Sequence, residues 1–556
     1  MNLPQVVLLL VTDQFRYDAF NPTVTPNLYH KLSLAANATT FTNAYTSTPV
    51  CTPARASLLT GKSPWAHGML GYGFTVNCEK YPTTLPFVLK DMLDYQTLAV
   101  GKQHFGVDSK TKSYYVDHGF DDLKIYDALT HQPYDDDYLD FFHALHPDVH
   151  YPISVTCDAQ THNEWIACPY GLRNESQHPT PWTTRQALQY LNDFDFKNIS
   201  SKLLLKVSYH RPHSPYDPPH RLLAKHLARP VPERFVNNTS WDRAFLNTTA
   251  MPRAAWYGDP GSVAARHSRA GYLASCEFVD EGVGELLDWL QEHNLFDSSL
   301  IVWTTDHGDM NGDHNLWRKG YPWEGSSHVN LIIKQPSIES DNHDKDDYDR
   351  SAGVKADPKH AWQQVRQQVQ SDAIVETRDI AVTLYDFLGV FENVQHRDPL
   401  VDGKSLLPIL NNESNKVRRW LDLELSRSFH DDIRDIHWNA IVGIYENANA
   451  NNDFSDGKGK QQECSVWKYI FHVLQGDEQL FCLAKDRHET HNLANHDEYQ
   501  AVLKHWRSTM ISQFMKEQRG HRWVKNNTLV SGRPPIVFAS NFPCKGETLG
   551  SENALK

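Results

Sequence analysis

The sequence predicts an α/β fold in which strands and helices alternate along the chain. Three short apolar runs, each followed directly by polar residues, are typical of strands covered on both faces: residues 6–11, 203–207 and 300–303. Between the second and third runs, apolar residues recur at alternating steps of four and three from Tyr272 to Leu290, which places one apolar stripe on a helix. This alternation favours helices packed on a sheet over a helix bundle or a β-sandwich.

Each of the three predicted strands ends in residues that can carry chemistry. The polar segments are Thr12-Asp13-Gln14, Tyr209-His210-Arg211-Pro212-His213 and Thr305-Asp306-His307-Gly308-Asp309. Ligands of α/β sheets bind at the carboxyl ends of strands. We therefore expect the three segments to meet at one rim of the sheet.

The rest of the chain predicts an insertion and a second, smaller unit. Residues 337–372 are polar and acidic, which indicates a solvated insertion. Shorter strands are expected at residues 438–445, 466–473 and 479–483, followed by a helix at residues 498–518. The sequence thus predicts a large α/β domain over residues 1–414 and a smaller α+β subdomain over residues 415–556.

Composition excludes several classes of partner. The 556 residues carry a formal charge of −14, from 54 basic and 68 acidic side chains without a basic block, which argues against a nucleic-acid groove. No apolar run approaches the roughly 20 residues needed to span a bilayer. The run at residues 6–11 is short and continues into Thr12 and Asp13, so it predicts a strand and not a signal peptide.

Cysteines and glycosylation motifs bear on the compartment. Eight cysteines are too few for a disulfide scaffold, although individual bridges remain open. Eight Asn-x-Ser/Thr motifs begin at Asn37, Asn174, Asn198, Asn237, Asn238, Asn247, Asn412 and Asn526. They favour a secreted or lysosomal glycoprotein whose signal peptide is absent from this chain.

Cys51 opens the densest motif in the sequence. Thr52-Pro53 after it is typical of a helix start, and Arg55 follows four residues on, so a helix N-terminus and a guanidinium would both lower the pKa of the thiol. On these grounds alone, an activated thiol competes with a buried structural cysteine, which is the commoner case.

The complete string from Val50 to Gly61 decides between them, because it resembles the signature of the type I sulfatases of the alkaline phosphatase superfamily. In that family the cysteine is oxidised after translation to formylglycine. Further segments match family motifs in order: Thr12-Asp13-Gln14, Gly101-Lys102-Gln103-His104-Phe105-Gly106, Arg211-Pro212-His213-Ser214-Pro215-Tyr216, Thr305-Asp306-His307-Gly308-Asp309 and Gly312-Asp313-His314-Asn315-Leu316-Trp317-Arg318-Lys319. The resemblance implies an alkaline-phosphatase-like sandwich with a large mixed central sheet flanked by helices, and a short antiparallel sheet in the C-terminal subdomain.

A divalent cation is expected between two of the strand ends. Asp13 and Asp306 are carboxylates at apolar strand ends, where an uncompensated charge costs several kcal/mol, and Gln14 and His307 stand beside them. The resemblance adds Cys51 to this ligand set and implies Ca²⁺. His307 resembles the branch with choline sulfatases and phosphonate monoester hydrolases, and because imidazole suits Mn²⁺ better than Ca²⁺, Mn²⁺ or another divalent ion stays open.

Five basic residues at family positions would bind a tetrahedral oxyanion: Arg55, Lys102, His104, His213 and Lys319. In a chain of charge −14, such a cluster forms a local trap for a sulfate ester. Most of the 30 histidines must be bystanders, and His67, His210 and His314 are expected to be among them.

The resemblance also implies a mechanism. Hydrated formylglycine at residue 51 attacks sulfur, while the metal and Arg55 stabilise the attacking oxygen. Lys102, His213 and Lys319 neutralise the sulfuryl oxygens and the departing alcohol. A base, with His104 as the candidate, then deprotonates the second hydroxyl, which expels sulfate and restores the aldehyde.

The implied partners are a sulfated small molecule or glycan and, during maturation, a formylglycine-generating enzyme. Two alternatives remain at this stage. A phosphonate monoester or phosphodiester hydrolase could use the same nucleophile. A non-catalytic protein could capture sulfated glycans and keep Cys51 as a free thiol.

Overall fold

The large sheet is mixed and has eight strands, as the fold class predicts. The computed structural model describes residues 3–71, 81, 83–104, 118–127, 136–148, 165–171, 174–235, 261–337, 369–427, 436–445 and 464–543. The strand order is β4-β3-β5-β1-β6-β7-β2-β8. The strands are β1 (Val6–Asp13), β2 (Ala38–Tyr45), β3 (Tyr95–Gly101), β4 (Asp122–Ile125), β5 (Lys202–Pro212), β6 (Leu300–Thr305), β7 (His328–Lys334) and β8 (Val369–Glu376). Only β7 runs against its neighbours in this sheet, pairing antiparallel with β6 and β2.

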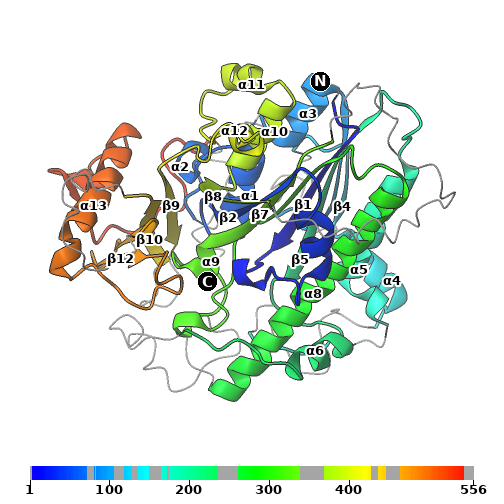
Figure 1. Cartoon of the computed structure of the whole chain (residues 1–556), viewed down its shortest axis with the longest axis horizontal. Helices are drawn as coiled ribbons and strands as arrows, with labels where there is room; N and C mark the ends of the chain where they lie inside the picture. Colours follow the sequence, from blue (N-terminus) through cyan, green and yellow to red (C-terminus); the bar gives the residue numbers. More distant parts are fainter. Residues whose placement is uncertain are drawn as a thin grey trace, which may run out of the picture.

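Helices cover both faces of the sheet (Figure 1). They are α1 (Cys51–Thr60), α2 (Pro64–His67), α3 (Leu85–Leu93), α4 (Asp137–Leu145), α5 (Pro179–Asp193), α6 (His220–Leu227), α8 (Ser262–Glu292), α9 (Glu324–Ser327), α10 (Asp379–Phe387), α11 (Phe391–Arg397) and α12 (Leu407–Leu410). On β1, Val7 and Leu9 join the core under α1, α3 and α10, whereas Leu8 and Leu10 join the core under α5 and α8. The continuous apolar run of β1 is therefore explained by burial on both faces.

The predicted core helix is confirmed as part of α8. Its six stripe residues are completely buried and lie in one core cluster: Tyr272, Cys276, Val279, Val283, Leu286 and Leu290. Cys276 thus packs as a small apolar side chain.

The predicted insertion needs a correction at its end. Residues 338–368 lie outside the described residues, but the last residues of the predicted segment form the start of β8. Val369 and Gln370 are exposed although they pair with Thr39 and Thr40 of β2. Because β8 is an edge strand of this sheet, its first residues face solvent. Their polarity hid the strand in the sequence.

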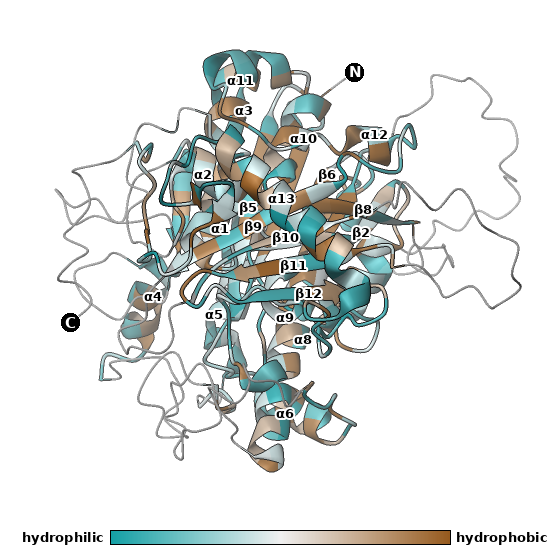
Figure 2. Cartoon of the chain, turned by 90° about the vertical axis from the view of Figure 1, so that its left-hand side faces the viewer, coloured by the Kyte–Doolittle hydropathy of each residue, from teal (hydrophilic) through white to brown (hydrophobic). Residues whose placement is uncertain are grey.

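The small antiparallel sheet of the C-terminal part is also confirmed. Its order is β12-β11-β10-β9, with β10 (Ile436–Gly443), β11 (Trp467–His472) and β12 (Glu478–Cys482) close to the three predicted strands. The predicted helix is α13 (Gln500–Lys516), which packs on this sheet and faces the viewer with it in Figure 2. β9 (Trp420–Arg427) was not predicted. The division of the chain at residue 414 stays a prediction.

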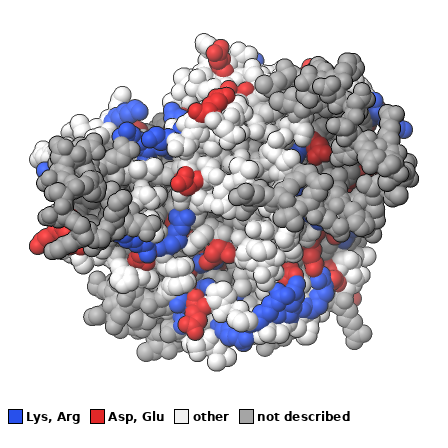
Figure 3. Space-filling view, viewed as in Figure 1, with Lys and Arg blue, Asp and Glu red and all other residues white. Residues whose placement is uncertain are grey.

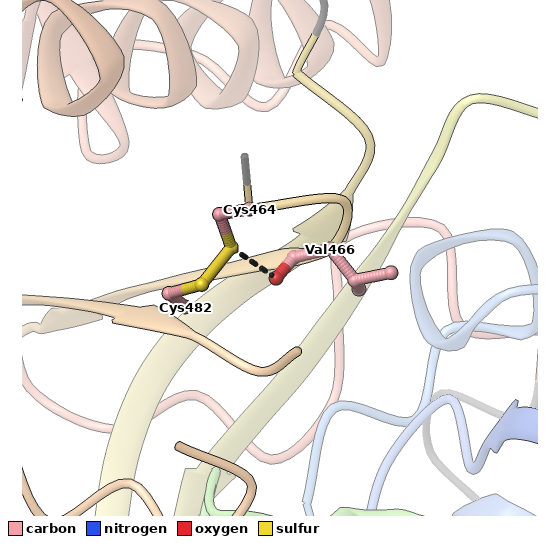
Figure 4. The surroundings of a disulfide bond; sticks show 3 residues. All are labelled: Cys464, Val466 and Cys482. Carbon is pink, nitrogen blue, oxygen red and sulfur yellow. Dashed lines mark hydrogen bonds between the residues drawn. A yellow bond between two sulfur atoms is a disulfide. The ribbon is translucent and has the colours of Figure 1, made fainter. Parts of the chain in front are cut away.

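A disulfide closes one edge of the small sheet. Cys464 is bonded to Cys482 at the end of β12, with the carbonyl oxygen of Val466 beside the Cys464 sulfur (Figure 4). Cys168 is also in a disulfide, while the free thiols of the described residues are Cys51 and Cys276. Among the helices in the described ranges, none is both long and apolar enough to cross a membrane.

Candidate active site

Cys51 is the first residue of α1, as its sequence predicts. Pro53 lies in the first turn, where a missing N–H costs nothing, and Gly61 ends the helix in a left-handed conformation with φ of 69°. All ten residues of α1 are buried. The sulfur of Cys51 therefore sits at the positive end of a buried helix dipole.

Cationic groups and an imidazole surround the Cys51 sulfur. Lys319 Nζ lies 2.8 Å away, His307 Nε2 3.2 Å away and Lys102 Nζ 3.7 Å away, while both carboxylate oxygens of Asp13 lie at 3.9 Å. Burial alone would raise the pKa of the thiol, but Lys102, Lys319 and His307 together hold it well below its usual value. The site thus favours negative charge at this position.

Two carboxylates from separate strand ends share one guanidinium beside this position. Arg55 on α1 places Nε 2.9 Å from Asp306 and Nη2 3.4 Å from Asp13. Lys102 forms a further ion pair with Asp13. Burial would raise the pKa of Asp13, but Lys102, Lys319 and Arg55 hold it well below its usual value, whereas burial and Asp13 raise the pKa of Asp306.

The same residues fit a divalent cation. Ligand atoms of Asp13, Cys51, Asp306 and His307 lie within 4.8 Å of one another, and all four residues are buried. The Nδ1–H of His307 donates to the Gly308 carbonyl at 3.0 Å, which turns the Nε2 lone pair towards the cluster. Gln14 donates Nε2–H to Asp309 at 2.6 Å, and its buried Oε1 has no hydrogen-bond partner among the described residues. An orphaned amide oxygen beside two carboxylates is the oxygen-rich donor set of a hard cation.

Lys102 and His104 come from the loop after β3. Gly101 makes the turn with φ of 87°, and a Cβ atom there would lie 2.1 Å from the Ser208 carbonyl oxygen, so only glycine fits. The loop is fixed by Asp127, which accepts hydrogen bonds from the backbone N–H of Gln103 (2.7 Å) and His104 (2.9 Å). Asp127 therefore fixes the backbone of His104, two residues beyond Lys102.

His213 lies just after β5 and is buried. Its Nδ1–H donates to the Ser214 carbonyl at 2.7 Å, so Nε2 carries the lone pair in the neutral ring. Burial, Lys319 and Lys102 together hold the pKa of His213 well below its usual value. The same two lysines contact the Cys51 sulfur, which places His213 on the basic side of the site.

Two supporting residues were missed by sequence reasoning. Asp127 follows the short strand β4, whose sequence Asp-Leu-Lys-Ile is half polar, so no apolar run marked it. Asp309 accepts hydrogen bonds from Gln14 Nε2, from the Tyr216 hydroxyl at 2.6 Å and from the Arg318 N–H at 2.8 Å. It thereby joins the end of β1, the loop after β5 and the segment that carries Lys319.

The structure brings the predicted site residues to one rim. Contacts join Asp13, Cys51, Arg55, Lys102, Asp306, His307 and Lys319 directly, and Gln14, His104 and His213 flank them. Their individual roles stay predictions. On the face shown in Figure 3, basic and acidic side chains are interspersed, whereas the Arg55, Lys102 and Lys319 cations are at most 6% exposed.

This arrangement defines a class of protein. A position for a nucleophile at a helix N-terminus, lined by buried amines, a guanidinium and a cation site, suits an ester of a compact oxyanion. At the carboxyl ends of a mixed α/β sheet, these features fit a hydrolase of such esters.

The chain belongs to the Sulfatase family, whose model matches residues 5–390. It is 27% identical over 548 residues to an arylsulfatase of Clostridium perfringens, covering 96% of this chain and 98% of that protein. It is 26% identical over 552 residues to a choline-sulfatase of Rhizobium meliloti, covering 95% and 91%. A phosphonate monoester hydrolase structure from Agrobacterium radiobacter shares the fold, with a TM-score of 0.64 and 21% identity over 96% of this chain and all of the other.

The predicted family, fold and enzyme class are therefore confirmed. The protein is a sulfuric ester hydrolase with an alkaline-phosphatase-like fold. The alternative of a non-catalytic binding protein is set aside by this assignment.

Proposed function

We propose that Cys51 is oxidised after translation to formylglycine and that the modified enzyme hydrolyses sulfate monoesters with the help of a divalent cation. The observation that carries this proposal is the position of the Cys51 sulfur, at the start of α1, with the Lys102 and Lys319 amines and His307 Nε2 within 3.7 Å. A formylglycine-generating enzyme is then the partner in maturation.

The modification and the cation have defined places in this proposal. Hydrated formylglycine would supply a hydroxyl nucleophile with a second hydroxyl through which sulfate can leave. The cation would be held by Asp13, Gln14, Asp306, His307 and residue 51, and would supply Lewis acidity at the nucleophile. Ca²⁺ is the first candidate, with Mn²⁺ or another divalent ion as the alternative that the His307 imidazole favours.

The protein's own residues would bind and orient the ester. Lys102 and Lys319 would neutralise sulfuryl oxygens, because their amines reach the position from which the nucleophile acts. Arg55 would hold Asp13 and Asp306 in register with α1. An anionic ester beside His213 would offset the two nearby lysines and favour a protonated ring, whose Nε2–H could then serve the departing alcohol. His104 is the candidate base for the release of sulfate.

The proposed substrate is a sulfated small molecule or carbohydrate. The test is to produce the protein together with a formylglycine-generating enzyme and to analyse the Cys51 peptide by mass spectrometry. Sulfate release is then measured on an aryl sulfate, choline sulfate, sulfated mono- and oligosaccharides and a phenylphosphonate ester. We expect formylglycine at residue 51, and sulfate esters turned over faster than the phosphonate ester.

The control is Cys51→Ala, which should leave only residual turnover. Full activity with an unmodified thiol would contradict the proposed nucleophile. A faster phosphonate reaction would instead support the alternative hydrolase that uses the same residue.

We also propose that the protein is a glycoprotein of the secretory or lysosomal route. The asparagines of the five glycosylation motifs within the described residues are all exposed: Asn37, Asn174, Asn198, Asn412 and Asn526. The Cys464–Cys482 disulfide supports an oxidising compartment. Treatment of the secreted protein with an N-glycosidase should lower its mass, and an unchanged mass would contradict the proposal.

A further inference from the structure

A buried chain of hydrogen bonds leads from α5 to the rim of the active site. It consists of His178, Asp217, Arg211 and His210, all of them at most 6% exposed. His178 Nε2 lies 3.3 Å from Asp217 Oδ1, and Arg211 binds both oxygens of the same carboxylate at 2.6 and 2.8 Å. Arg211 Nη1 then lies 2.7 Å from His210 Nδ1. His210 is thus the last member of this hydrogen-bond chain and lies in the buried C-terminal half of β5.

The chemistry of the donors fixes where each proton lies. His178 Nδ1 accepts the backbone N–H of Thr180 at the start of α5, so its proton is on Nε2 and points to Asp217. Arg211 has only donors and stays charged. His210 Nδ1 must therefore accept from Arg211, which leaves the proton of the neutral His210 ring on Nε2.

His210 and His213 present opposite chemistry to the site. Their ring centroids are 4.9 Å apart. His213 donates through Nδ1 to a carbonyl and offers a lone pair at Nε2, whereas His210 accepts at Nδ1 and offers an N–H at Nε2. Among the described residues, the one side-chain hydrogen bond of His210 is made at Nδ1, so Nε2 is available to a ligand.

The surroundings of His210 are those of the anion site. Burial, Lys102, Arg211 and His213 hold the pKa of His210 well below its usual value, and Asp13 acts on it in the opposite sense. Its neighbours in β5, Tyr209 and Pro212, pair with Thr12 and Asp13 of β1, and the Tyr126 ring lies 5.2 Å from the His210 ring. The N–H of the neutral His210 ring can donate to an anionic oxygen while the ring stays unprotonated at neutral pH.

We propose that His210 is a substrate-binding residue whose Nε2–H donates a hydrogen bond to an anionic oxygen of the sulfate ester. This inference rests on the proposed function and deepens it. Under this proposal, His210 takes part in substrate binding, whereas the sequence alone predicts that it is a bystander. Arg211, Asp217 and His178 become positioning residues, because they act only by fixing the His210 ring.

Two substitutions separate substrate binding from a structural role. In His210→Asn the amide oxygen can still accept from Arg211, but the donor at the Nε2 position is lost. In His210→Gln the amide N–H reaches about as far as Nε2, but the partner of Arg211 is lost. A hydrogen bond to a charged group predicts a loss in kcat/KM of roughly 10- to 100-fold for His210→Asn. We expect His210→Gln to keep most of kcat/KM and to melt at a lower temperature.

The reverse pattern, with His210→Asn active and His210→Gln inactive, would overturn the inference and leave His210 a structural residue. His226→Asn is the matched control, because His226, on the remote helix α6, is also a buried histidine but pairs with Glu277 of α8. It should leave kcat/KM unchanged.

Binding of inorganic sulfate to the Cys51→Ala protein tests the inference apart from turnover. Titration calorimetry should show sulfate binding weakened by about tenfold or more when His210→Asn is added, and not when His210→Gln is added. Equal affinities in all three proteins would overturn the role of His210 even if the enzyme hydrolyses sulfate esters. If no ester is turned over, the proposed function fails, while the calorimetric comparison still decides the role of His210.

Discussion

At the Cys51 sulfur, two amines and an imidazole lie closer than either oxygen of Asp13. The carboxylates nevertheless hold cations at this position, because Asp13 pairs with Arg55 and Lys102, and Asp306 pairs with Arg55. At the scale of single residues, the centre of the site is a balance of buried charges in which Asp13 and Asp306 both have basic partners. Removing one member leaves the others uncompensated, which costs several kcal/mol.

The first prediction concerns the cation. Asp13→Ala and Asp306→Asn should each abolish cation binding and activity, because each removes a carboxylate ligand from a set that lies within 4.8 Å. Elemental analysis of the purified proteins measures occupancy directly. Asp288→Asn is the control, since Asp288 pairs with Lys31 at the surface of α8. Full occupancy in either site variant would show that the cation lies elsewhere.

The second prediction concerns the leaving group. His213→Ala and Lys319→Ala should slow hydrolysis of a sugar sulfate by something like the 10²- to 10⁴-fold of positioned acid catalysis, and that of nitrophenyl sulfate far less. A sugar alkoxide needs a proton or a fixed cation to depart, and nitrophenolate does not. Single-turnover rates should be compared so that release of sulfate does not mask the first step.

The control for this comparison is Lys504→Ala, an exposed residue of α13 that should change neither rate. Equal losses on the two substrates would mean that His213 and Lys319 bind the sulfate group itself.

Most of these residues could be predicted because they belong to strings of adjacent residues at strand ends. The role proposed for His210 could not be predicted from the sequence, for a physical reason. A histidine's role depends on which nitrogen carries the proton, and that is set here by Arg211 and Asp217 through contacts that no spacing displays. Asp127 accepts hydrogen bonds from backbone N–H groups, which any residue offers, so nothing in the sequence marks its partners. Asp309 joins Gln14, Tyr216 and Arg318, and its contacts with Gln14 and Tyr216 span a distance in sequence that no local motif displays.

At the scale of elements, the short helix α9 connects the small sheet to the site. Lys468 on β11 is completely buried, and its Nζ lies 2.8 Å from Glu324 and 2.9 Å from Glu489. Glu324 opens α9, whose Ser326 carbonyl accepts the Gly308 N–H at 2.8 Å. A side chain of the small sheet therefore supports the loop that carries His307.

The third prediction follows from this contact. Lys468→Met should destabilise the protein by roughly 3–5 kcal/mol, because two buried carboxylates lose their shared cation. The melting temperature should fall by several degrees, and kcat/KM should fall even at temperatures where the variant is folded. Lys504→Met provides a matched loss of one lysine at the surface. An unchanged melting temperature would refute a supporting role for Lys468.

How well each strand could be predicted depended on how its buried residues are arranged along the sequence. The apolar runs at residues 6–11 of β1, 203–205 of β5 and 300–303 of β6 arise because both faces of these strands are covered, and the sequence shows this directly. β2 is buried although it contains Thr39, Thr40 and Asn43, so its polarity hid it. β9 alternates Leu421, Leu423 and Leu425 with polar residues and could have been found from period two. The antiparallel placement of β7 depends on long-range pairing, which composition does not encode.

At the scale of the whole molecule, the small sheet and the large domain share a core. Tyr45 and Val50 of the large part pack in one cluster with Leu423 and Ile470 of the small sheet. Val50 directly precedes Cys51, so the C-terminal part packs against the residue next to Cys51. The sequence suggests two separate parts, but in the structure these parts share one apolar cluster.

The fourth prediction tests this shared core. A chain ending at residue 414 should be insoluble or inactive, because it lacks the small sheet and therefore exposes the apolar cluster around Tyr45 and Val50. The measurement is the soluble fraction and the rate of sulfate release, with co-expression of residues 415–556 as the rescue. A soluble, active chain of residues 1–414 would contradict the prediction.

The burial of Cys51 orders events in the life of the protein. Its side chain is 1% exposed, and the helix that begins with it is buried along its whole length. If Cys51 is oxidised as proposed, the modifying enzyme must reach a thiol that the folded protein covers. We therefore expect maturation to have a deadline: the oxidation should precede the docking of α1, and protein that folds unmodified should stay inactive when it later meets the modifying enzyme.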